Sequence, residues 1–233
     1  MNIDSRNWFE IVSAIVVLYC WLVRPTSVTR VLAPLLLISV CVELSSKLLL
    51  IEYYKTHNKN FITAKLVMYS LFNIIKFCCS LFLVFFLLND KKNIATYVKG
   101  SCLVIGFVVL NLIFFQGYYV YNNYSNCFGI LVLIAITLYK LINFENFKII
   151  QSNRTPVMIY LFLIVFFYTI NFPFFVFYQQ MFTEDQQRGV VIYRSINGSA
   201  NYIFYAGLAL ATILFTFGNN STRFFKSKAI SNI

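Results

Sequence analysis

Charged residues are scarce in this sequence. Only 12% of the 233 residues are Asp, Glu, Lys or Arg, whereas 60% are hydrophobic. A soluble domain carries roughly 25% charged residues, and a chain of this length is an ordinary single-domain size. Too few charges are available to build the surface of a soluble fold, so the composition predicts a polytopic membrane protein.

Residues that bind metals are also few. His57 is the only histidine, and the six cysteines lie within or beside apolar runs, where cysteine behaves as a small hydrophobic residue. These cysteines are Cys20, Cys41, Cys78, Cys79, Cys102 and Cys127. A zinc site of the usual His/Cys kind has no ligand set here, so we expect no metal and no cofactor.

Motifs of enzymes and nucleotide-binding domains are missing as well. The polar connections are too short for a further domain, which usually needs at least about 50 residues. The sequence has no P-loop and no G-x-G-x-x-G. No histidine lies at membrane depth to act as a base beside Gly198-Ser199. We therefore expect neither an enzyme nor a nucleic-acid partner.

Seven apolar runs approach or exceed the length of a membrane span, which takes about 20 residues. They are Trp8–Val23, Val31–Ile51, Phe61–Leu88, Val98–Phe115, Cys127–Asn143, Pro156–Tyr178 and Ile196–Phe217. We expect an all-α, seven-helix transmembrane bundle over residues 1–217 and a short basic cytoplasmic tail over residues 218–233. The first run lacks the positive n-region and cleavage site of a signal peptide, so we expect it to be retained.

Lysines and arginines predict the orientation of these runs. With the N-terminus outside, the inner segments hold about 11 of them and the outer segments about 5. The inner ones are Arg24, Arg30, Lys91, Lys92, Lys99, Lys140, Lys148, Arg154, Arg223, Lys226 and Lys228. The positive-inside rule therefore predicts an N-out, C-in topology, and the net charge of +11 follows from it.

Ionisable residues inside a span are costly and usually functional. Glu43 lies within the second run and is expected to be the only acid in a span interior, because Glu10 stands at the start of the first run. Lys47 follows Glu43 at the i+4 spacing that favours an ion pair. The third run carries polar residues that share one helical face: Lys65, Tyr69, Asn73, Lys76 and Ser80.

Later spans add amides to this set. Asn171 precedes Pro173, whose missing N–H predicts a kink and a carbonyl without its usual donor. The candidate ligand- or proton-binding residues are Glu43, Lys76, Asn73, Tyr69, Asn171 and Asn201. Two alternatives stay open. Glu43 and Lys76 can form a purely structural ion pair, and buried asparagines often only hold helices together.

Four short stretches resemble the uncharacterised seven-helix integral membrane proteins of Bacteroidota. They are Glu43, the stretch Tyr69-Ser-Leu-Phe-Asn-Ile-Ile-Lys-Phe77, the pair Thr155-Pro156, and Asn201-Tyr-Ile-Phe-Tyr205. The resemblance covers most of the chain and implies a multi-pass protein of the bacterial inner membrane. Lys76 stands where that group tends to have Glu.

Two functional classes follow from these observations. The first is a sensory or signal-relay component that binds a ligand from the outer side and acts through a cytoplasmic partner. The second is a small-solute or proton-coupled transporter with a polar site in mid-membrane, which should show a path accessible alternately from each side. A pure scaffold subunit is a third option.

Overall fold

The computed structural model describes residues 5–88, 94–115, 123–147, 153–177 and 186–230, and all regular structure within these ranges is helical. The helices are α1 (Ser5–Val23), α2 (Ser27–Thr56), α3 (Asn60–Leu87), α4 (Ile94–Leu110), α5 (Asn123–Ile142), α6 (Arg154–Val176) and α8 (Gln186–Ile230). A π-helical turn, Asn111–Phe115, continues α4, and a short 3-10 helix, Phe144–Asn146, follows α5. The prediction of an all-α fold is confirmed.

Six of these helices are long and apolar enough to cross a membrane, and α1 carries a shorter apolar stretch, Trp8–Val23. Large hydrophobic side chains stay exposed around the bundle, among them Leu22, Phe114 and Ile142. A soluble protein rarely exposes apolar surface so widely. The helices are thus consistent with a multi-pass membrane protein.

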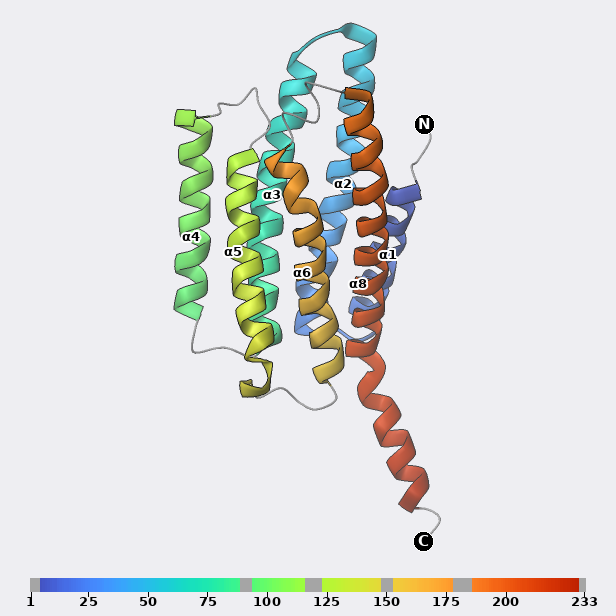
Figure 1. Cartoon of the computed structure of the whole chain (residues 1–233). Helices are drawn as coiled ribbons and strands as arrows, with labels where there is room; N and C mark the ends of the chain where they lie inside the picture. The colour runs from blue at the N-terminus through green and yellow to red at the C-terminus, as the bar shows by residue number, and fades with distance from the viewer. Residues whose placement is uncertain (1–4, 89–93, 116–122, 148–152, 178–185, 231–233) are drawn as a thin grey trace.

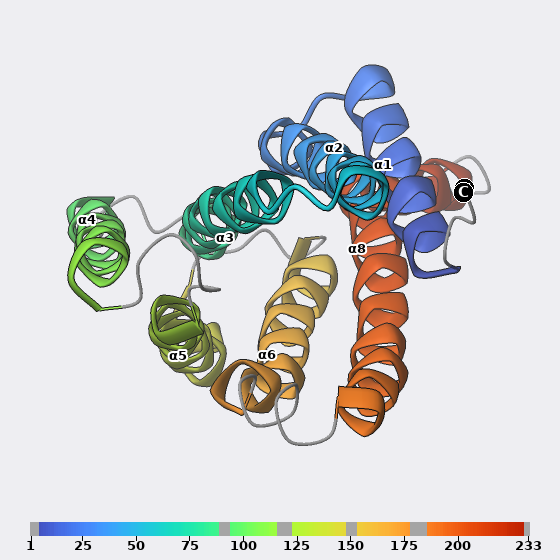
Figure 2. The ribbon, with the colours of Figure 1, turned by 90° about the horizontal axis from the view of Figure 1, so that it is seen from above.

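The helices are arranged as a ring. Seen from above, α1, α2, α3, α5, α6 and α8 follow one another around the ring, and α4 lies outside it beside α3 and α5 (Figure 2). Successive helices run antiparallel (Figure 1). The start of α1 and the turn between α2 and α3 therefore lie at one end, here the turn end. The last part of α8 leaves the opposite end, here the tail end.

Helix α2 begins and ends with clear local signals. The Thr26 side chain accepts a hydrogen bond from the Thr29 N–H while the Thr29 hydroxyl binds the Thr26 backbone, which is a capping box. The helix ends at His57, whose left-handed backbone (φ 52°) lets its N–H bond the Tyr53 carbonyl.

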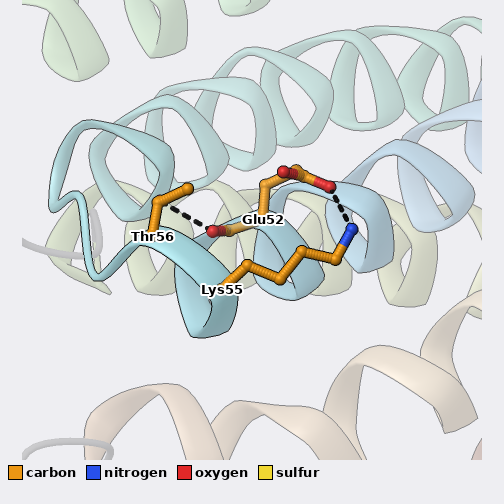
Figure 3. A network of polar contacts seen from close by, with 3 residues as sticks. All are labelled: Glu52, Lys55 and Thr56. Carbon is orange, nitrogen blue, oxygen red and sulfur yellow. Dashed lines mark hydrogen bonds and ion pairs between the residues drawn. The ribbon is translucent and has the colours of Figure 1, made fainter.

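The last turn of α2 is polar. Lys55 Nζ lies 2.8 Å from Glu52 Oε1, and the Thr56 hydroxyl donates to the Glu52 carbonyl over 2.8 Å (Figure 3). These side chains are exposed, so the ion pair adds little stability. At 1.5 Å per residue the 30 residues of α2 span about 45 Å. That length matches a bilayer including its headgroups, about 40–45 Å.

Helix α8 is longer than the sequence suggests. Its 45 residues span about 68 Å, and its last turns project from the tail end away from the other helices (Figure 1). A connection was expected up to Ser195 and a separate tail from residue 218, but one helix includes both. Hydropathy marks where the apolar residues end and does not mark where a helix ends, so α8 extends beyond its apolar run on both sides.

The tail-end half of the bundle is filled by tightly packed apolar residues. Leu81, Val84, Leu133 and Leu161 from α3, α5 and α6 are completely or almost completely buried there. Helix α8 approaches α6 closely at Gly207, where a Cβ atom would lie only 2.6 Å from a methyl carbon of Leu163. This half of the ring therefore has a closed interior.

Candidate functional site

A cavity of about 160 Å³ lies inside the ring and is lined by side chains from all seven helices. A single water needs only about 10–15 Å³ by this kind of measure, so the space is large enough for a small solute. The lining residues lie in the first turns of α1 and α5 and the last turns of α6. The cavity is therefore in the turn-end half of the bundle. We call it the central cavity.

The structure places every site residue proposed from the sequence on this cavity. Glu43, Tyr69, Asn73, Lys76, Asn171 and Asn201 all line it. They come from four helices, α2, α3, α6 and α8, so the helix packing brings together residues that are up to 158 positions apart (201 − 43). Their role in binding a ligand or a proton stays a prediction.

Glu10 belongs to the same cavity and was missed. Its side chain is only 3% exposed, and its carboxylate accepts a hydrogen bond from the Ser39 hydroxyl. Tyr205 of α8 lines the same cavity. Glu43 repels Glu10 electrostatically, and Lys76 attracts it. The expectation that Glu43 is the only acid within the bundle was therefore wrong.

Helical periodicity explains the burial of Glu10. Helix α1 begins at Ser5, ahead of the apolar run, so Glu10 lies in its second turn and not at its end. Glu10, Ser13, Ala14, Val17 and Cys20 are all buried and recur at three- or four-residue spacing. That pattern marks the inward face of an amphipathic helix, and it was visible in the sequence.

Lys76 is held against aromatic rings. Its Nζ lies 4.8 Å from the centre of the Phe167 ring and 6.0 Å from that of Tyr168. A cation over a ring face is attracted by the ring quadrupole, more strongly where water is excluded. The Tyr168 hydroxyl in turn lies 3.4 Å from the Ser80 hydroxyl, one turn beyond Lys76 on α3. The lysine is thus positioned by α6 as well as by its electrostatic attraction to Glu10.

Two asparagines of the site use their amide nitrogens within their own helices. Asn171 Nδ2 donates to the Phe167 carbonyl over 2.7 Å, and Asn201 Nδ2 donates to the Asn197 carbonyl over 2.6 Å. Asn201 Nδ2 also lies 2.8 Å from Asn197 Oδ1. These bonds fix the side chains, and both residues are buried at the cavity wall. They therefore present amides of defined orientation to the interior.

Polar atoms on α5 line the cavity without a partner. Ser125 is 2% exposed, and neither its Oγ nor Asn126 Nδ2 has a hydrogen-bond partner among the described residues. Both residues lie in the first turn of α5. Both residues precede Cys127, where the fifth apolar run begins, so hydropathy gives no reason to select them.

Two local expectations have mixed outcomes. Lys47 Nζ is buried and forms no hydrogen bond within the described part of the chain, so the expected bond to Glu43 is not made.

Pro173 lies in the last turn of α6, which continues to Val176. Asn171 is buried at the cavity wall, whereas Thr169, whose carbonyl lacks the Pro173 donor, is exposed.

A partition separates the central cavity from the packed tail-end half. Ser39, Phe72, Lys76 and Tyr205 line both the central cavity and a smaller space of about 30 Å³ below it. Tyr160, completely buried at the bottom of that space, shares a 2.6 Å hydrogen bond with Thr212. The central cavity is thus closed toward the tail end by named side chains of α2, α3, α6 and α8.

Within the described residues, no three His, Cys, Asp or Glu side chains are grouped so that they could hold a metal ion. The chemistry that the cavity offers is therefore that of carboxylates, one ammonium, amides, hydroxyls and aromatic rings. No family model, curated protein or solved structure matches this chain. The resemblance to the Bacteroidota group stays a prediction.

Proposed function

We propose that this chain is a seven-span sensory or signal-relay protein of the bacterial inner membrane, with its N-terminus outside and its C-terminus inside. In this proposal the central cavity binds a small polar ligand from the outer side. Binding shifts α8, and the part of α8 beyond the tail end passes that shift to a cytoplasmic partner. Charge asymmetry of the connections supports the orientation.

The observation that carries the proposal is the continuity of α8. Asn197, Asn201 and Tyr205 of α8 line the cavity, and the same helix continues without a break to Ile230. A continuous helix transmits a rotation or translation along its length, and shifts of about 1–2 Å are typical of signalling helices. A ligand that contacts Asn201 therefore acts on a continuous helix that reaches the other end of the bundle.

Helix α1 is hydrogen-bonded to α8, so in this proposal the two helices move together. The Ser13 hydroxyl donates to the Tyr205 carbonyl over 2.6 Å, and Arg24 Nη1 donates to the Thr216 carbonyl over 2.9 Å. The Phe9 and Tyr202 rings are in contact near the turn end, with centroids 4.9 Å apart and planes tilted by 44°. Contacts at both ends of α1 make it follow α8, so a ligand bound beside Glu10 acts on both helices.

Transport of a solute or of protons is the second candidate. The observation that favours it is the small space below the partition, which Lys76 and Ser39 share with the central cavity. A transporter needs that path to continue to the tail end in another conformation. The closed packing around Leu81, Leu133 and Leu161 opposes such a path in this structure.

A ligand panel combined with a distance measurement tests the proposal. Purified protein is heated in the presence of small amines, carboxylates, zwitterions and neutral sugars, since a ligand of the folded state raises the melting temperature. The stabilising solute is then added to protein in nanodiscs with spin labels at Leu214 on α8 and Met158 on α6. Both side chains are exposed near the tail end, and the native cysteines are replaced by alanine.

We expect the distance between these two labels to change when the stabilising solute is added. A control pair at Tyr139 on α5 and Met158 should keep its distance, because neither helix is the proposed relay. If no solute class stabilises the protein, the ligand site is refuted. If a solute stabilises the protein and accumulates in proteoliposomes while the distance between the Leu214 and Met158 labels stays unchanged, the transport function is the correct one.

A further inference from the structure

The central cavity has two walls of different chemistry. On one side, α1 and α2 contribute the carboxyl groups of Glu10 and Glu43, which repel each other. Lys76 supplies one ammonium group against these two acids. Lys65, which does not line the cavity, also attracts Glu43. The wall therefore presents two carboxyl groups, whose oxygens can accept hydrogen bonds from a ligand ammonium.

The wall across the cavity is suited to an anion. It is formed by the first turn of α5, a helix of 20 residues whose leading N–H groups carry partial positive charge. Ser125 Oγ and Asn126 Nδ2, both lacking partners among the described residues, lie on this wall. A buried polar atom without a partner is costly, so these atoms are explained by a ligand group that they bind.

We propose that the central cavity binds a small zwitterion with one ammonium and one carboxylate group, as in an α-amino acid. The ammonium lies against Glu10 and Glu43, and the carboxylate accepts hydrogen bonds from Ser125 and Asn126. Helices α1 and α2 lie across the ring from α5 (Figure 2), so the two groups are held at opposite ends of one molecule. This inference rests on the proposed function, because it names the ligand of the same site.

Simpler ligands satisfy only one wall. An amine without a carboxylate leaves Ser125 Oγ and Asn126 Nδ2 without a hydrogen-bond partner. A carboxylate without an amine is repelled by Glu10 and Glu43. The remaining surface combines amide, aliphatic and aromatic side chains. Two of the aromatic rings, Phe167 and Tyr168, already face the Lys76 ammonium. The site therefore distinguishes ligands by the presence of both charges.

The test is a thermal-shift series on the full chain in detergent. The probes are the standard amino acids taken singly at millimolar concentration, each with its primary amide and its N-acetyl form. We expect at least one amino acid to raise the melting temperature. Its amide lacks the carboxylate and its N-acetyl form lacks the ammonium, so both should bind about tenfold to a hundredfold more weakly.

The matched variant is Ser125→Ala combined with Asn126→Leu. Because these two polar atoms make no hydrogen bond within the described chain, their removal should leave the melting temperature of the ligand-free protein unchanged or higher. Affinity for the amino acid should fall about tenfold or more, to that of the corresponding decarboxylated amine. Ser45→Ala, at an exposed position of α2, should change neither quantity.

The possible failures are distinguishable. If simple amines or neutral solutes stabilise the protein and amino acids do no better, the zwitterion is wrong while the ligand-binding cavity stands. If the double variant binds the amino acid as tightly as the natural chain does, the assignment of the α5 wall is wrong. If no probe of any class stabilises the protein, both the zwitterion and the proposed function are refuted.

Discussion

The Ser39 hydroxyl on α2 donates a hydrogen bond to the Glu10 carboxylate on α1, and both side chains are buried. One turn further along α1, the Ser13 hydroxyl donates to the Tyr205 carbonyl of α8. Helices α1, α2 and α8 are thus joined beside one acid at the edge of the central cavity. These contacts fix the position of a buried charge and tie α1 and α2 to the helix that leaves the tail end.

Ser39→Ala removes the hydrogen bond that Glu10 accepts from α2. A bond to a charged group contributes about 1.5–3 kcal/mol in soluble proteins, although polar contacts between membrane helices average about 0.6 kcal/mol. We expect a loss of about 1 kcal/mol, seen as a lower melting temperature in detergent. Ser45→Ala on the exposed face of α2 is the control, and equal losses in both variants would refute the special role of Ser39.

Lys76→Gln leaves the two acids of the cavity without the lysine charge. Removing one member of a fully buried charge pair costs about 3–5 kcal/mol. Lys76 and Glu43 are half-buried, so the cost should be smaller, and the yield of folded protein should fall. Adding Glu43→Gln removes one acid and should restore part of the yield. Fluorescence size-exclusion chromatography of tagged protein measures both effects.

The matched control for this pair is Lys99→Gln, because Lys99 is an exposed lysine on α4. Its yield should stay near that of the natural chain. If the double variant folds as poorly as Lys76→Gln alone, the charges are not coupled. If it folds well and still responds to the ligand, Glu43 and Lys76 are structural and do not contact the ligand.

Tyr160→Phe tests the closure below the cavity. The Tyr160 hydroxyl shares a 2.6 Å hydrogen bond with Thr212 in the packed tail-end half and joins α6 to α8. Its loss should cost about 1 kcal/mol and let α8 move more freely. Tyr139→Phe, at an exposed tyrosine of α5, should leave the melting temperature unchanged. A Tyr160→Phe protein as stable as the Tyr139→Phe protein would contradict this assignment.

Cysteine labelling tests the orientation. In a background without native cysteines, Lys59→Cys between α2 and α3 should react with a membrane-impermeant maleimide added to intact cells. Glu145→Cys between α5 and α6 should react only after permeabilisation. Both side chains are exposed. Labelling of both positions from the same side would rule out the seven-span topology.

Hydropathy predicted where helices occur, because an apolar run of span length has few alternatives to a helix. It could not predict where α8 begins and ends, since this helix extends beyond its apolar run through Gln186–Ser195 and through the residues after Gly218. It also could not predict that Lys47 Nζ would make no hydrogen bond. Spacing on one helix allows a contact, but tertiary packing decides the rotamer.

The candidate residues of the cavity were largely predictable one helix at a time. Polar positions such as Asn73 and Asn201 are conspicuous in apolar runs, and such side chains normally face the interior of a bundle. Glu10 was missed because it precedes the apolar run, although its spacing from Ser13 and Val17 places it on the inward face. Ser125 could be found only from the packing of α5 against its neighbours.

Solvent accessibility along α8 tests the central claim most directly. Asn201 lines the cavity, whereas Ala211, ten residues further along the same helix, is completely buried in the tail-end half. A small, charged, membrane-impermeant thiol reagent added outside intact cells should modify Asn201→Cys. It should leave Ala211→Cys unmodified, both from outside and in inverted vesicles. Modification of Asn201→Cys only from the inner side, or of Ala211→Cys from either side, would contradict a ligand cavity that opens outward and is closed below.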